Sequence, residues 1–183
     1  MTVHDPYVLP ENLPVPVDDG AADHLTGAEL PDLVLPSSQG AVNIRDFDVL
    51  YVYPRTGRPG RDLLPGWDEI PGARGCTPQS CGFRDHNAEL AELGMRVAGV
   101  SAQSLEDQLE FAARNRMPFP VISDEWLDLA RDPALPTFEV EGLTLYRRLA
   151  LIAREGKVIK VFYPVFPPDR NAADVVAWLR EDR

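Results

Sequence analysis

The chain has 183 residues, which suits one domain with a sizeable hydrophobic core. Its formal net charge of −11 repels phosphate groups, so we expect neither nucleic-acid binding nor binding to an anionic membrane. The chain has no apolar run long enough to span a bilayer, and MTVHDPYVLP lacks the features of a signal peptide, so we expect a cytoplasmic protein in which a permanent structural disulfide is uncommon.

The first half of the chain predicts an arm, a hairpin, a strand and a long loop. Residues 1–30 are rich in Pro, Asp and Gly without a period, which indicates an extended arm before a domain over residues 31–183. Residues 30–47 predict a short β-hairpin around residues 38–40, and the almost continuous apolar run at 48–56 predicts a strand in the middle of a sheet. Residues 57–75 hold five Gly and three Pro, so we expect a loop, and a loop of that length is often functional.

The second half alternates helices and strands. It predicts a helix from Thr77 to Gly94, a strand at 95–103, a helix capped by Ser104, a strand at 119–124 and a short helix from residue 125. Strands at 137–165, with a turn at 155–156, and a closing helix capped by Asn171 complete the pattern. Strand–helix–strand crossovers imply parallel strands and the late hairpin adds antiparallel ones. This order predicts an α/β thioredoxin-like fold, a central mixed sheet flanked by helices.

Cys76 and Cys81 are the two cysteines of the chain. Cys76 lies where the first helix is predicted to begin, and the unpaired N–H groups of a helix start favour a thiolate, which is the reactive form. Arg74 is a candidate to add positive charge there. Five residues along a helix give a rise of about 7.5 Å and a turn of about 140°, whereas a disulfide needs Cα atoms within about 7 Å. The two thiols therefore cannot bridge until part of the helix unwinds.

Two other interpretations of the cysteines are weaker. Both could be small buried hydrophobic residues, but that leaves the glycine-flanked helix start and the preceding loop unexplained. A metal site would need further ligands, and neither a third Cys nor a nearby His cluster supplies them. We expect no metal and no other cofactor.

Several segments together resemble the peroxiredoxins. YVYP, GCTPQSCGFRD, VAGVSAQ, PFPVISDE and REGKVIKVF are similar to the subgroup called peroxiredoxin Q or bacterioferritin-comigratory protein, from about Leu30 to the C-terminus. The resemblance implies that Cys76 attacks hydrogen peroxide or an organic hydroperoxide and becomes a sulfenic acid. It also implies that Cys81 condenses with it to a disulfide, and that thioredoxin or a similar dithiol restores both. Neither haem nor flavin is implied.

This chain departs from the family at the threonine whose hydroxyl group contributes to the active site. The family has a Thr three residues before the peroxidatic cysteine, where this chain has Ala73. YVYP, which normally leads within a few residues to that Thr, is here followed by an inserted loop, residues 57–72. If the insertion falls after Thr56, that residue takes the hydroxyl role, and Pro54 matches the proline that shields the family's site.

The family also has an Arg on the late hairpin that holds the thiolate and the peroxide. Arg147 and Arg148 are the candidates, and on a continuous strand only one of them can face the helix start. The resemblance implies Arg147, because the family's pattern of Arg-x-x-apolar-x-apolar before the turn, here residues 155–157, aligns best on it. On a continuous strand Arg147 would also lie on the same face as Leu145, Leu149 and Leu151. We therefore predict Arg147 as the active-site arginine.

Two alternative functions use the same cysteines. One is a thiol–disulfide oxidoreductase of the same fold, although that class usually has C-x-x-C, which this pair is not. The other is a non-enzymatic redox sensor that signals through helix unwinding. Turnover separates them, because an enzyme consumes many equivalents of peroxide and a sensor about one. We expect the protein to be a monomer or a weak homodimer.

Overall fold

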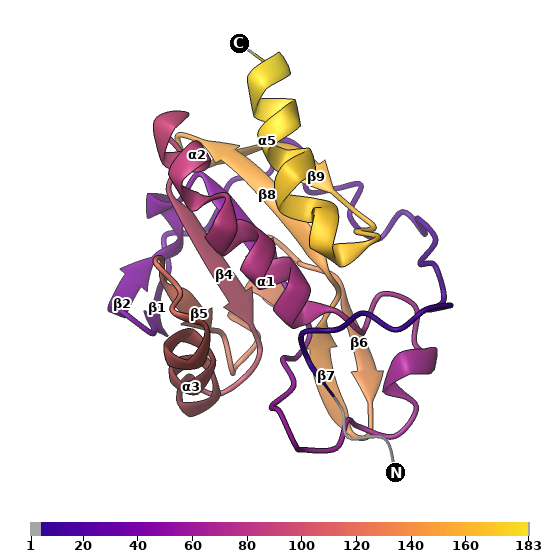
Figure 1. Cartoon of the computed structure of the whole chain (residues 1–183). Helices are drawn as coiled ribbons and strands as arrows, with labels where there is room; N and C mark the ends of the chain where they lie inside the picture. The colour runs from indigo at the N-terminus through magenta and orange to yellow at the C-terminus, as the bar shows by residue number, and fades with distance from the viewer. Residues whose placement is uncertain (1–4, 183) are drawn as a thin grey trace.

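The computed structural model describes residues 5–182, which form a seven-stranded mixed sheet and a separate two-stranded sheet (Figure 1). The strands are β1 (Val34–Ser37), β2 (Gly40–Asn43), β3 (Val49–Val52), β4 (Val97–Ser101), β5 (Val121–Ser123), β6 (Thr137–Val140), β7 (Leu143–Tyr146), β8 (Leu149–Arg154) and β9 (Lys157–Phe162). The helices are α1 (Cys76–Asp85), α2 (Asn87–Glu92), α3 (Leu105–Asn115), α4 (Asp128–Arg131) and α5 (Asn171–Glu181).

The large sheet has the strand order β2-β1-β5-β4-β3-β8-β9. Strands β3, β4 and β5 are parallel, because α-helical crossovers connect them. Strands β8 and β9 extend one edge in antiparallel pairing, and β1 and β2 form the predicted hairpin at the other edge. The predicted mixed sheet flanked by helices is confirmed, and β3 lies near its centre.

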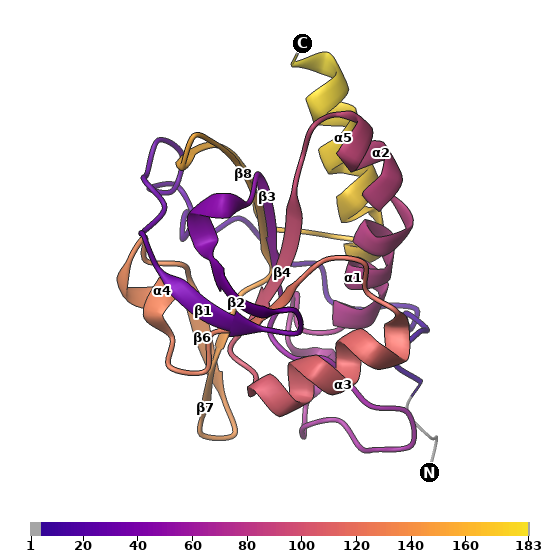
Figure 2. The ribbon, with the colours of Figure 1, turned by 90° about the vertical axis from the view of Figure 1, so that its left-hand side faces the viewer.

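Helices α1, α2, α3 and α5 share one face of the large sheet, while α4 and part of the N-terminal arm cover the other (Figure 2). The residues of β3 alternate between these layers. Val49 and Tyr51 belong to the core beneath the four helices, and Leu50 and Val52 to the core beneath α4 and the arm. Both faces of β3 are therefore buried, as its continuous apolar run predicts.

An aromatic stack fixes α1 to the sheet. The rings of Tyr51 and Phe83 of α1 lie nearly parallel with centroids 4.5 Å apart. Gly99 of β4 makes room for this arrangement, since a Cβ added there would lie 2.6 Å from the Tyr51 ring. The helix that carries both cysteines is thus packed on the middle of the sheet.

Three predicted details differ from the structure. The helix expected from Thr77 to Gly94 is divided at His86, whose ring Nδ1 lies 2.8 Å from the carbonyl oxygen of Gly82. Asn171 is the first residue of α5 and not its cap, because its side chain bonds elsewhere. The long strand expected before the turn at 155–156 is two strands, β7 and β8, which belong to different sheets.

The predicted arm runs along the surface as turns and extended chain. Its first four residues lie outside the described part of the structure. Glu29 forms an isolated antiparallel bridge with Lys157, which joins the end of the arm to β9. Among residues 5–182, the helices are too short or too polar for any of them to cross a membrane.

Candidate active site

The site is built around the start of α1. Cys76 is the first residue of this helix, as predicted, and Gly75 before it has a left-handed backbone with φ of 110°. A Cβ at Gly75 would collide with Pro168 and would lie 3.0 Å from Leu9, so both conformation and space require glycine. Only 3% of Cys76 is exposed. The sulfur therefore meets the positive end of a helix in a nearly closed site.

Arg148 holds this sulfur. Its Nη2 donates to Cys76 Sγ at 3.2 Å and to the carbonyl oxygen of Ala73 at 2.9 Å, and its Nη1 donates to Gln79 Oε1 at 2.6 Å. The Arg148 side chain is buried, yet among residues 5–182 it forms no ion pair with a carboxylate. An unpaired buried charge is costly, and Cys76 is the one acidic side chain that this guanidinium contacts.

The prediction that Arg147 faces Cys76 is wrong. Arg147 Nε donates to the carbonyl oxygen of Thr137 at 3.2 Å, and its guanidinium lies 5.8 Å from the centre of the Phe138 ring. The parity argument failed because the two arginines are not inside one strand. They connect β7, in the small sheet, to β8, in the large sheet, and the alternation of a continuous strand does not apply at such a crossing.

Two polar residues that the sequence analysis missed support Arg148. Gln79 is fully buried, and besides accepting from Arg148 it donates through Nε2 to Asn171 Oδ1 at 3.0 Å. Gln79 is three residues after Cys76, so both side chains share one face of α1, and that spacing was an available signal. Asn171 was predicted only as a helix cap. Nothing in the sequence indicated its contact with Gln79, which lies 92 residues earlier in the chain.

Thr56 does not occupy the predicted position beside the thiol. Its hydroxyl exchanges hydrogen bonds with the side chain of Gln103 at 3.1–3.2 Å, and its backbone N–H donates to the same residue at 3.0 Å. The insertion leaves Thr56 facing a neighbouring cavity. Thr77 is better placed, since it lines the small cavity at Cys76, is 2% exposed, and its Oγ1 has no hydrogen-bond partner among the described residues.

Cys81 lies further along α1 and is half-buried. Its Sγ is 3.8 Å from Asn115 Oδ1, and both cysteines are free thiols in this structure. Burial raises the pKa of the Cys81 thiol above its ordinary value, although the nearby Arg84 acts in the opposite direction. Cys76 and Cys81 are thus held in different surroundings within one intact helix.

The inserted loop and the N-terminal arm close the site. Arg74 bonds both carboxylate oxygens of Asp68, at 2.8 and 3.0 Å, and donates to the carbonyl oxygens of Asp5 and Val8, so its charge is directed at the loop and the arm and not at the thiol. Trp67 of the inserted loop is buried, and it also lines the cavity at Cys76.

Metal-binding side chains do not gather in this region. Across the described residues, no three His, Cys, Asp or Glu side chains are close enough together to hold a metal ion.

Comparison with known proteins gives one result. The family model described as Redoxin matches residues 25–177. Peroxiredoxin Bcp of Bacillus subtilis is 31% identical over 155 residues, which cover 80% of this chain and 89% of that protein. The crystal structure of peroxidoxin BcpB from Mycobacterium tuberculosis superposes with a TM-score of 0.67 at 26% identity, covering 86% of this chain and 97% of that one. The bacterioferritin comigratory protein of Xanthomonas campestris gives a TM-score of 0.64 at 25% identity, covering 85% and 97%. The chain therefore belongs to the redoxin family, and within it to the peroxiredoxins of the Bcp and Q type.

Proposed function

We propose that the protein is a thiol-dependent peroxidase that reduces hydrogen peroxide and organic hydroperoxides, with Cys76 as the peroxidatic and Cys81 as the resolving cysteine. The observation that carries the proposal is the contact of 3.2 Å between Arg148 Nη2 and Cys76 Sγ at the start of α1. A buried cation and a helix N-terminus there favour a thiolate, and a thiolate is the nucleophile that a peroxide requires.

The first step is a displacement at oxygen. The Cys76 thiolate attacks one oxygen of the peroxide, an S–O bond forms and the O–O bond breaks. The leaving hydroxide or alkoxide takes up a proton and departs as water or an alcohol, and Cys76 is left as a sulfenic acid. Arg148 and the N–H groups at the start of α1 stabilise the negative charge as it moves onto the leaving oxygen.

The second step requires α1 to open. Cys81 attacks the sulfenic sulfur, an S–S bond forms, and the sulfenic oxygen leaves as water. Because the intact helix separates the two residues by about 7.5 Å of rise and about 140° of rotation, its first turns must unwind before the bond can form. A dithiol, thioredoxin or a similar one, then returns both thiols to the reduced state by thiol–disulfide exchange.

Turnover with a dithiol tests the assignment of the cysteines. In a steady-state assay with thioredoxin and its reductase, the wild-type protein is expected to consume many equivalents of peroxide. Cys76→Ser should consume none, and Cys81→Ser about one in the absence of a substitute thiol, because its sulfenic acid cannot be resolved. A wild-type protein that stops after one equivalent would point to the sensor interpretation, and near-normal turnover by Cys76→Ser would exclude Cys76 as the peroxidatic residue.

Substitution of the two arginines tests the corrected assignment. Arg148→Gln should lower the second-order rate of peroxide attack by about 100-fold, because it removes a donor aimed at the reacting sulfur and oxygen. Arg147→Gln, the matched control, should change that rate less than about threefold. Stopped-flow measurement of peroxide loss checks both, with near-ultraviolet circular dichroism as the test of folding. A larger effect from Arg147→Gln in a folded protein would restore the original prediction.

Substitutions at two threonines test which hydroxyl group donates a hydrogen bond in the active site. We propose that Thr77, which lines the cavity at Cys76 and whose buried hydroxyl has no partner among the described residues, supplies the donor that Thr56 does not. Thr77→Val should slow peroxide attack about tenfold, as expected for a lost hydrogen bond to a charged group, and Thr77→Ser should retain most of the rate. Thr56→Val is the control and should leave the rate within twofold. Equal rates in Thr77→Val and the wild type would show that no hydroxyl is needed.

Stabilising α1 should slow the second step alone. At Gly82, a Cβ would lie 3.5 Å from the Asp169 carbonyl oxygen and 3.6 Å from the Ala172 Cβ, which are ordinary contacts, so the helix accepts alanine. Gly82→Ala favours the helical state by about 1 kcal/mol, so disulfide formation should slow about fivefold while peroxide attack is unchanged. Rapid-quench alkylation followed by peptide mapping measures the disulfide. An unaltered rate would mean that the bridge forms without opening this part of the helix.

A further inference from the structure

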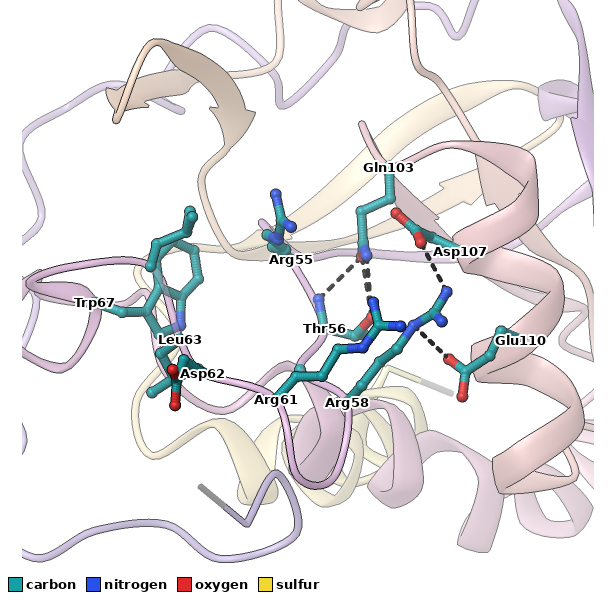
Figure 3. Close-up of a pocket in the computed structure, with 12 residues that line it drawn as sticks. Arg55, Thr56, Arg58, Arg61, Asp62, Leu63, Trp67, Gln103, Asp107 and Glu110 are labelled. Carbon is teal, nitrogen blue, oxygen red and sulfur yellow. Dashed lines mark hydrogen bonds and ion pairs between the residues drawn. The ribbon is translucent and has the colours of Figure 1, made fainter. Parts of the chain in front are cut away.

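A second cavity lies beside the mouth of the site, between the inserted loop and α3, and Figure 3 shows its lining. Its volume is about 100 Å³, which admits a small headgroup and not a whole large ligand. Arg55, Arg58 and Arg61 all line it, in a protein whose net charge is −11. Arg58 is half-buried, whereas Arg55 and Arg61 are exposed, so two of these three positive charges are open to a charged molecule from solution.

One of these arginines is already neutralised. Arg58 lies 3.0 Å from Asp107 and 3.5 Å from Glu110, and Glu110 also pairs with Arg114 at 2.7 Å. Two cations and two carboxylates of this network therefore balance. The network fixes the loop against α3. Because its charges cancel, the other charged residues that line the cavity determine the net charge there.

Arg55 and Arg61 keep an excess of positive charge. Neither forms an ion pair with another group within residues 5–182. Asp62 also lines the cavity, but in Figure 3 its carboxylate lies near Leu63, apart from Arg55 and from the Arg61 headgroup, which points toward Gln103. Even with Asp62 counted, one positive charge is left over, which suits a monoanion.

This cavity adjoins the one that reaches the thiol. The small cavity at Cys76 shares four lining residues with it: Arg55, Gly57, Leu63 and Trp67. The two cavities therefore have a common wall, which includes the side chains of Leu63 and Trp67, and a molecule held at the arginines would lie next to the cavity at the sulfur. The combined surface has an anion-binding end, an apolar wall and a reacting group.

We infer that Arg55 and Arg61 bind the carboxylate of an organic hydroperoxide whose peroxide group reacts at Cys76; this rests on the proposed peroxidase function. The guanidinium fork matches a carboxylate in shape and in hydrogen-bond geometry. The chemistry at sulfur is unchanged: the O–O bond breaks, Cys76 becomes the sulfenic acid, and the hydroperoxide leaves as a hydroxy acid after protonation of its alkoxide. The carboxylate is not consumed, and a dithiol supplies the two electrons of the cycle.

The test compares two substrates that differ in one charge. They are the hydroperoxide of isocaproic acid, with its peroxide on the tertiary carbon, and the methyl ester of the same compound. In the wild-type protein the acid should have a kcat/KM about tenfold above that of the ester, because it alone gains the charge-assisted hydrogen bonds. Equal values for the two compounds would overturn the inference.

Substitutions at the arginines test whether this cavity causes the preference for the acid over the ester. The double substitution Arg55→Gln, Arg61→Gln should abolish it, so that the acid and the ester have equal kcat/KM in the variant. Arg131→Gln with Arg154→Gln is the matched control, since it removes the same charge from side chains that are 74% and 62% exposed, and it should keep the preference. A preference that survives the first pair, or disappears in the second, would show that net charge and not this cavity attracts the acid.

A binding measurement separates this inference from the proposed function. Isocaproate without a peroxide group, titrated into Cys76→Ser protein in a calorimeter, should bind saturably, and the Arg55→Gln, Arg61→Gln pair should abolish the signal. If neither hydroperoxide is reduced, the peroxidase proposal fails, and the titration still decides whether the anion site exists. Absence of saturable binding in Cys76→Ser would overturn the site itself.

Discussion

The burial of the Arg148 guanidinium is the constraint on which the site depends. Its donors reach Cys76 Sγ, the Gln79 amide oxygen and two backbone carbonyl oxygens, and none of these is a carboxylate. Neutral oxygens satisfy hydrogen bonds but do not cancel a buried charge, which costs several kcal/mol when left without a counter-ion. A thiolate at Cys76 is the counter-ion that this geometry offers. The negative charge that would stabilise the buried Arg148 is therefore the same charge that the proposed mechanism requires on the Cys76 sulfur.

The same interaction explains why a helix that must be formed in one step can open in the next. In the reduced protein Arg148 contacts the Cys76 sulfur at the start of α1, and the stack of Tyr51 on Phe83 holds the second half of the helix. In the proposed cycle, Cys76 attacks as a thiolate and becomes a neutral sulfenic acid, which weakens the attraction at the first turn. The packing of Phe83 is unaffected, so opening is favoured where the disulfide needs it. The chemical step thus prepares the conformational one, without a separate signal.

The features of the site that depend on neighbouring residues could be predicted from the sequence, whereas those that depend on contacts between distant residues could not. A glycine before a cysteine at a helix start, the Ser104 cap and the buried β3 each depend on neighbouring residues, and the structure agrees with them. The choice between Arg147 and Arg148 depended instead on where one strand ends and another begins, which sheet pairing decides. Asn171 was read as a helix cap because that residue type favours the position, whereas tertiary contact with Gln79 determined its place.

The inserted loop changes the site at two places at once. It carries Thr56 away to Gln103, and it brings the Ala73 carbonyl to the position from which it accepts a hydrogen bond from Arg148. A carbonyl can orient the guanidinium but cannot donate to a peroxide, so the proposed donor comes from elsewhere: Thr77 lines the cavity at Cys76, and its buried hydroxyl has no partner among the described residues. The loop also contributes the wall past which a substrate must enter. If the anion site proposed above exists, the loop also affects the choice of peroxide, because it carries Arg61 of that site.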